Sequence, residues 1–218
     1  MRRRHLLALL LNLPATAVLA QPAGAALIEA AARGDTAEVR RLLDAGAPVN
    51  ARDASGRNAA LAATQGAHTE AALLLIARGA DVNAQDSLQD SVFLLAGARG
   101  RTEIVRAALA AGANLRSTNR YGGTALIPAC HYGHVDTVRL LLTTAIDVNH
   151  VNRLGWTALL EAVILGDGGP AHTEIVRLLL AARADPSIAD REGVTPLRHA
   201  VQRGQARIAQ LLREAGAR

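Results

Sequence analysis

The sequence is poor in aromatic residues. Phe, Trp and Tyr together make up 2% of the 218 residues, whereas half of all residues are apolar, mostly alanine and leucine. A core without bulky rings must bring small side chains close together, which packed helices do better than a sandwich of sheets. The composition therefore predicts an all-α fold.

Lysine is absent, and cysteine occurs once. All 24 basic residues are arginine, and they alternate with 19 acidic residues instead of forming runs. That pattern argues against a surface that follows a phosphate backbone, so we expect no nucleic-acid partner. A lone cysteine, Cys130, excludes an internal disulfide, so burial and packing must hold the fold together.

Residues 1–20 have the pattern of a secretory signal peptide. Three arginines precede a short apolar run, Leu6–Leu13, and small residues lead to a cleavage site after Ala20. The run is too short for a permanent membrane span. Arg3 and Arg4 loosely resemble a twin-arginine signal, but we favour the general secretory route. Cleavage would lower the formal charge from +5 to +2 and yield a periplasmic protein. The alternatives are a buried first helix and a cytoplasmic scaffold.

A repeat of 33 residues runs through the rest of the chain. Gly-x-Thr-Ala-Leu begins at Gly122 and again at Gly155, and Gly-Ala-x-Val-Asn occurs at 46–50 and 79–83. Self-similarity at such a period is typical of stacked helical units, none of which buries enough surface alone. The units are predicted at about 24–51, 52–84, 85–117, 118–150, 151–188 and 189–218, the fifth with a five-residue insertion near 167–171.

Helix caps follow from the same pattern. A hydroxyl before each apolar helical run can accept N–H groups of the first turn, and a left-handed glycine can end the helix. The predicted N-caps are Thr124, Thr157 and Thr195. The predicted stops are Gly34, Gly100, Gly133, Gly166 and Gly204. Phe93 takes the place of a signature leucine and is predicted to lie in the core.

These phrases resemble the ankyrin repeat. Gly193–Ala200 reads Gly-Val-Thr-Pro-Leu-Arg-His-Ala, and Glu174–Leu180 reads Glu-Ile-Val-Arg-Leu-Leu-Leu. The sequence around Trp156 and the glycine-rich insertion resembles that of exported bacterial ankyrin proteins. The resemblance implies a solenoid of about six helix–turn–helix units joined by short β-hairpin turns. It also implies recognition of a protein through hairpin tips and first-helix ends. We expect a monomer without a cofactor or a metal.

The fourth and fifth units carry the candidate partner-binding residues. Tyr, Trp, Leu, Ile and Arg stand there at positions that the scaffold does not need for packing. Contiguous exposed apolar surface rimmed by charge usually marks an interaction site, and Trp, Tyr and Arg are the usual anchors. The candidates are Arg120, Tyr121, His131, Tyr132, Arg153, Leu154, Trp156, Ile164 and Leu165. The alternative is that the glycine-rich insertion covers Ile164 and Leu165 while Trp156 packs on its own hairpin.

Chemistry-bearing residues are few. His131 and His134 lie near Cys130, but Gly133 separates the histidines, and zinc needs three or four converging ligands. Cys130 fits a small, buried packing position. Glu161 stands inside a first helix, where an inter-unit pair with Arg198 or His199 is possible.

The sequence thus predicts a periplasmic, non-catalytic module that binds an exported protein. One alternative is a stabilising, protective or immunity/inhibitor partner of a specific exported enzyme. A remote alternative is a metal-dependent enzyme using His131 and His134.

Overall fold

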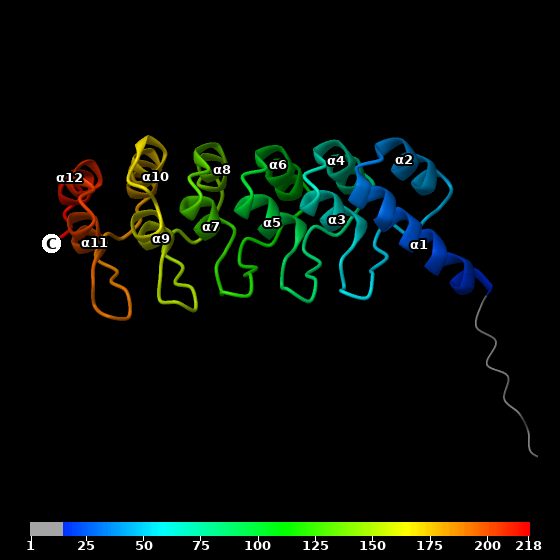
Figure 1. Ribbon diagram of the computed structural model, residues 1–218, viewed down its shortest axis with the longest axis horizontal. Coiled ribbons are helices and arrows are strands. Elements are labelled where there is room, and N and C mark those ends of the chain that lie inside the picture. The colour runs from blue at the N-terminus through cyan, green and yellow to red at the C-terminus, as the bar shows by residue number, and fades with distance from the viewer. Residues whose placement is uncertain (1–14) are drawn as a thin grey trace, which may run out of the picture.

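The computed structural model describes residues 15–218, with side chains from residue 22 onward. These residues form twelve helices in six consecutive pairs, and each pair is one repeat unit (Figure 1). The first helices of the units are α1 (Ala15–Arg33), α3 (Ala59–Gln65), α5 (Val92–Ala98), α7 (Leu126–His131), α9 (Ala158–Ile164) and α11 (Pro196–Gln202). The second helices are α2 (Thr36–Asp44), α4 (Thr69–Ala77), α6 (Thr102–Ala110), α8 (Val135–Leu141), α10 (Pro170–Ala181) and α12 (Ala206–Glu214).

The units stack side by side in two rows. Second helices form one row and first helices the other, and the hairpin loops project beyond the row of first helices (Figure 1). The predicted all-α solenoid of about six units is confirmed. The hairpin turns contain no β-strand anywhere in residues 15–218. Phe93 and Cys130 are fully buried in the core between the rows, as predicted.

One type of side-chain cap shapes every hairpin. The residue at the start of each loop accepts the backbone N–H groups of the residues two and four positions later, at 2.8–3.1 Å. Asx side chains stabilise turns in this way. The backbone N–H of the same first residue of the loop donates to the carbonyl of the residue four positions later. These residues are Asp53, Asp86, Asn119, Asn152 and Asp190, which explains the acidic or amide residue in each repeat.

Side chains also bridge neighbouring units to backbone carbonyls. Asn50 donates to the carbonyl of Gly79 at 3.1 Å, and Asn83 to that of Gly112 at 3.0 Å. A ring nitrogen of His172, on the second helix of the fifth unit, lies 2.9 Å from the carbonyl of His131, on the first helix of the fourth unit. Because these bonds repeat along the stack, they fix the register of each unit on the next.

The predicted helix caps are mostly correct. Thr157 and Thr195 accept from the N–H groups of Leu160 and Arg198. Thr124 caps no helix, and its buried hydroxyl has no hydrogen-bond partner among the described residues. Helix α7 begins two residues after Thr124, whereas α9 and α11 begin directly after their threonines. The reason is that Pro128 lacks the N–H that would bond to the Thr124 carbonyl. That carbonyl instead accepts from Ile127 at 3.3 Å.

The predicted stops also hold, with one exception. Gly34, Gly100, Gly133 and Gly204 have φ between 65° and 75°, in the left-handed region. Gly166 does not, so its predicted role is wrong. The insertion moves the turn onward: Gly168 takes φ 71°, and Pro170 opens an α10 of 12 residues, longer than the other second helices.

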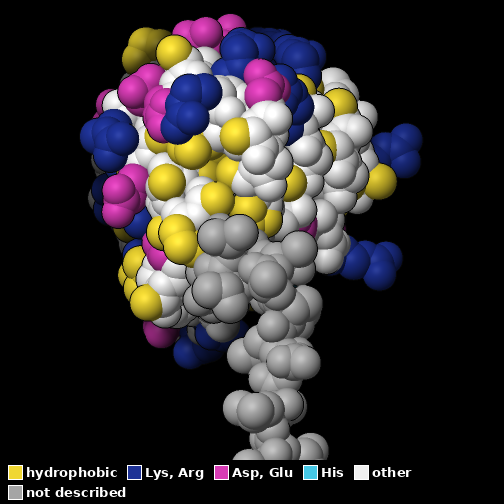
Figure 2. All heavy atoms as spheres, turned by 90° about the vertical axis from the view of Figure 1, so that its right-hand side faces the viewer, with side chains coloured by type: hydrophobic (Ala, Val, Ile, Leu, Met, Phe, Trp, Pro, Cys, Tyr) yellow, Lys and Arg dark blue, Asp and Glu magenta, His cyan; other side chains and the backbone are white. Residues whose placement is uncertain are grey.

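The N-terminal predictions fall partly outside the described residues. Residues 1–14 of the predicted signal peptide are among those not described, and α1 begins at Ala15, before the predicted unit boundary. No helix in residues 15–218 is long and apolar enough to cross a bilayer. At this end of the stack, apolar side chains gather in the middle of the face, and basic side chains lie along its upper edge with acidic ones beside them (Figure 2).

Candidate functional site

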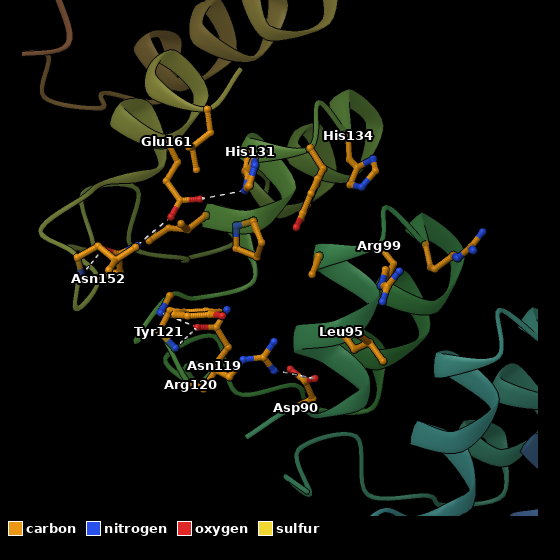
Figure 3. Close-up of a pocket in the computed structure, with 18 residues that line it drawn as sticks. Asp90, Leu95, Arg99, Asn119, Arg120, Tyr121, His131, His134, Asn152 and Glu161 are labelled. Carbon is orange, nitrogen blue, oxygen red and sulfur yellow. Dashed lines mark hydrogen bonds and ion pairs between the residues drawn. The ribbon is translucent and has the colours of Figure 1, made fainter. Parts of the chain in front are cut away.

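A cleft of about 770 Å³ opens between the third, fourth and fifth units. Its walls come from α5, α7 and α9 and from the hairpins that precede α7 and α9 (Figure 3). Apolar residues contribute much of the lining, and charged groups of both signs stand among them. The cleft therefore offers apolar contact together with a few fixed polar groups, as ligand-binding clefts commonly do.

Six of the nine predicted partner-binding residues line this cleft: Arg120, Tyr121, His131, Tyr132, Leu154 and Leu165. Tyr121 is 52% exposed and Tyr132 60%, and both leucines are exposed as well. The insertion therefore leaves Leu165 uncovered. Large apolar side chains held open to water at a concave surface are typical of an interaction site.

The other three predicted residues lie beside the cleft. Arg153 donates to the carbonyl of Arg120 at 3.0 Å, so it ties one hairpin to the next. Trp156 and Ile164 are half-buried and do not line the cleft. The backbone of Trp156 closes its hairpin: the Trp156 N–H bonds to the side-chain oxygen of Asn152, and the Trp156 carbonyl accepts from the Asn152 N–H.

Sequence reasoning missed the third unit's contribution. Asp90, Leu95, Arg99 and Arg101 all line the cleft, although none of them is among the predicted partner-binding residues. The signal was present as charged residues at the positions equivalent to Gly123 and Tyr132. What the repeat spacing did not show is that stacking brings these side chains into one cleft with the fourth unit.

Asn119 positions Tyr121 in the hairpin of the fourth unit. Its side-chain oxygen accepts from the N–H of Tyr121 at 2.9 Å. The Arg120 guanidinium lies 5.1 Å from the centre of the Tyr121 ring, within the range of a cation–π contact. It also lies 3.7 Å from a carboxylate oxygen of Asp90. Burial and the neighbouring Asp86 raise the pKa of Asp90, and Arg120 and Arg99 partly oppose that rise.

The end of α7 presents a flat π surface. The rings of His131 and Tyr132 stack with centres 4.1 Å apart, and the ring of His134 lies 6.1 Å from that of Tyr132. Burial, and the nearby His172, lower the pKa of His131, so its imidazole is neutral near pH 7. A neutral ring stacked on a tyrosine offers contact area without a charge of its own.

Glu161 is the buried acid of the cleft. Its residue is only 7% exposed, and one carboxylate oxygen accepts from the Asn152 amide at 2.9 Å. The other oxygen lies 3.8 Å from Nδ1 of His131, beyond hydrogen-bond range. Burial raises the pKa of Glu161 to about 7, and the Asn152 bond offsets only part of that rise.

The suggested pairing of Glu161 with Arg198 or His199 is wrong. An inter-unit contact does exist, but it points to His131 in the preceding unit. His199 bonds instead to Asp190 of its own unit at 2.6 Å. Side chains on α9 and α11 at equivalent positions both turn toward the start of their own hairpin, which keeps Glu161 away from the sixth unit.

The donor set for metal or nucleophilic chemistry is thin. Among residues 22–218, no group of three His, Cys, Asp or Glu side chains is arranged to hold a metal ion. His131 and His134 diverge: His134 packs on Gly100 and bonds the backbone of Ala98, on the third unit. Cys130 is fully buried, and burial raises the pKa of its thiol well above the ordinary value.

The comparisons with known proteins agree with this architecture. A family model described as ankyrin repeats (3 copies) matches residues 4–86, 92–190 and 147–218. The chain belongs to the ankyrin-repeat family. The comparison with curated proteins gave no match.

Solved ankyrin structures resemble the chain over most of its length. An ankyrin repeat domain from Acinetobacter baumannii AYE is 52% identical, with a TM-score of 0.85; the match covers 88% of this chain and 98% of that one. EF0377, an ankyrin repeat protein, is 42% identical with a TM-score of 0.84 and the same coverage. The ankyrin repeat domain of Bcl-3, a member of the IkappaB protein family, is 25% identical, with a TM-score of 0.76 and coverage of 88% and 86%.

The insertion in the fifth ankyrin unit supports the end of α7, which lines the cleft. Asp167 accepts from the N–H of Gly169 at 2.8 Å and lies 2.8 Å from Nδ1 of His172. The other nitrogen of His172 reaches the carbonyl of His131 at the end of α7. The insertion thus acts on the helix that carries the His131–Tyr132 stack, and not on the exposed leucines.

Proposed function

We propose that this ankyrin-repeat chain is a non-catalytic binding module that holds an extended segment of another protein in the cleft between its third, fourth and fifth units. The fold itself is a generic protein–protein interaction fold. The observation that carries the proposal is the concave cluster of exposed Tyr121, Tyr132, Leu154 and Leu165 beside arginines. Tyrosine and arginine in a desolvated pocket are the commonest sources of interface binding energy.

The partner that we propose is an exported protein, met in the periplasm. The support is the signal-peptide pattern of residues 1–20. N-terminal sequencing of the protein recovered from a periplasmic fraction checks this part, and the expected first residue is Gln21. A chain that keeps Met1 and stays in the cytoplasm would contradict the location without touching the cleft.

The binding part is tested by removing the two exposed rings. We expect the pair Tyr121→Ala and Tyr132→Ala to weaken partner binding about thirtyfold or more, because each truncation removes an anchor of the cleft. The measurement is affinity capture from a periplasmic extract, followed by titration of the recovered partner in a calorimeter.

A matched control removes exposed apolar residues elsewhere. Leu88 and Val201, each 53% exposed, lie outside the cleft, so the pair Leu88→Ala and Val201→Ala should leave binding unchanged. Helix content should be the same in all variants. Equal loss in both pairs, or no loss in the tyrosine pair, would place the binding surface elsewhere.

A further inference from the structure

Glu161 occupies a position where the fold does not need a carboxylate. The equivalent position of the second unit holds Ala62, that of the third Leu95 and that of the fourth Pro128. These small or apolar residues lie on the same face of their first helices as Glu161 does on α9. The repeat fold therefore does not require a carboxylate at this position, and we look for its role in binding.

The carboxylate also lacks a partner of opposite charge. Within residues 22–218, the one basic group within 4 Å of it is His131, and that ring is kept neutral near pH 7. One oxygen is held by Asn152, and no donor in the described part of the chain lies within hydrogen-bond distance of the other. A buried carboxylate costs free energy unless a cation or further donors satisfy it.

The surroundings of the free oxygen suit a basic side chain. Glu161 and the His131–Tyr132 stack line the same cleft (Figure 3), so an entering cation would meet a carboxylate and a π surface together. The arginines do not fill this role. Arg120 already contacts Asp90 and Tyr121, and Arg99 and Arg101 belong to the third unit, at the far wall.

We propose that Glu161 is a specificity residue that accepts the basic side chain, arginine or lysine, of the protein segment bound in the cleft. This inference rests on the proposed function, because it names the chemistry that the same cleft selects. The buried carboxylate discriminates because a partner with a neutral residue at that point would leave it uncompensated.

A display library of random twelve-residue peptides, selected on the full chain, tests the proposal. We expect the wild type to enrich sequences that carry a basic residue at one fixed place beside apolar residues. For an enriched peptide, Glu161→Gln should weaken binding about thirtyfold or more and remove the basic preference. Glu192→Gln is the matched control, since that exposed carboxylate of the sixth unit lies outside the cleft, and it should change binding less than about threefold.

The outcomes separate the two proposals. If selected peptides require Tyr121 and Tyr132 but bind Glu161→Gln as tightly as wild type, the specificity role of Glu161 is overturned while the binding cleft stands. If no enriched peptide depends on the two tyrosines, both proposals fall. Thermal unfolding of Glu161→Gln guards against misfolding: a lower melting temperature at pH 8 would mark Glu161 as a structural residue and overturn the proposal.

Discussion

The fifth and sixth units carry opposite chemistry at one pair of equivalent positions. In the sixth unit, Asp190 begins the hairpin and His199 reaches back to it from α11. In the fifth unit, the neutral Asn152 begins the hairpin and the acid, Glu161, reaches back from α9. The sixth unit pairs an acid, Asp190, with a base, His199, whereas the fifth pairs its acid, Glu161, with a neutral amide. The backbone is the same, so the difference belongs to the side chains.

The two arrangements respond to pH in opposite directions. Burial raises the pKa of Asp190, but bonds from the Val194 N–H and His199 outweigh it and hold that pKa below its ordinary value. Its contribution to stability is present above the unfolded pKa and is lost as pH falls. The pKa of Glu161 is raised from 4.5 to about 7, so its contribution is present below about pH 4.5 and is lost as pH rises through about 7.

The largest expected effect comes from breaking the sixth-unit pair. Asp190→Ala removes the acceptor of two backbone N–H groups and of His199, and should lower the free energy of unfolding by about 3 kcal/mol. Asp190→Asn keeps the backbone bonds and should cost about 1 kcal/mol. Urea unfolding at pH 7 measures both. Equal costs would mean that the hairpin cap contributes nothing beyond the histidine contact.

Neutralising the fifth-unit acid should stabilise the protein. Glu161→Gln keeps the bond from Asn152 and removes the cost of a buried charge, so we expect a gain of about 2 kcal/mol at pH 8. At pH 4, where the carboxyl is protonated both folded and unfolded, the variant and the wild type should unfold alike. Thermal melts at the two pH values are the measurement. A pH-independent difference would show that charge is not its cause.

A double substitution in the fifth unit should have a smaller effect on stability. Asn152→Asp together with Glu161→His recreates the sixth-unit arrangement in the fifth unit. Each single change leaves a mismatched neighbour, so the double variant should be more stable than the sum of the singles by about 1 kcal/mol. A double-mutant cycle in urea measures this coupling. Additive singles would indicate that the two sites do not contact each other in this unit.

The repeat spacing predicted much of this architecture. A step of 33 residues placed the helix pairs, the hairpins and the exposure of Tyr121 and Tyr132 correctly. Local departures were harder to foresee. Pro128 removed a backbone donor and so delayed the start of α7, and the insertion moved the left-handed glycine from 166 to 168.

The composition of the cleft was predicted only in part. Spacing tells which residues lie on a helix face, but it does not tell which neighbouring unit a side chain meets. For that reason the prediction left out Asp90, Arg99 and Arg101. It also suggested a partner for Glu161 in the sixth unit, whereas the side chain lies near His131 of the fourth. Trp156 is among the predicted residues, but it is half-buried and does not line the cleft.

The side-chain bridges between units bear on how fast a partner can bind. Because Arg153 and His172 fasten the fifth unit to backbone carbonyls of the fourth, these two walls of the cleft stand in place before a partner arrives. The ordering entropy of association then falls on the incoming segment and not on the solenoid. A rigid host of this kind should capture its ligand in a single kinetic phase whose rate rises in proportion to concentration, with no slow rearrangement after the encounter.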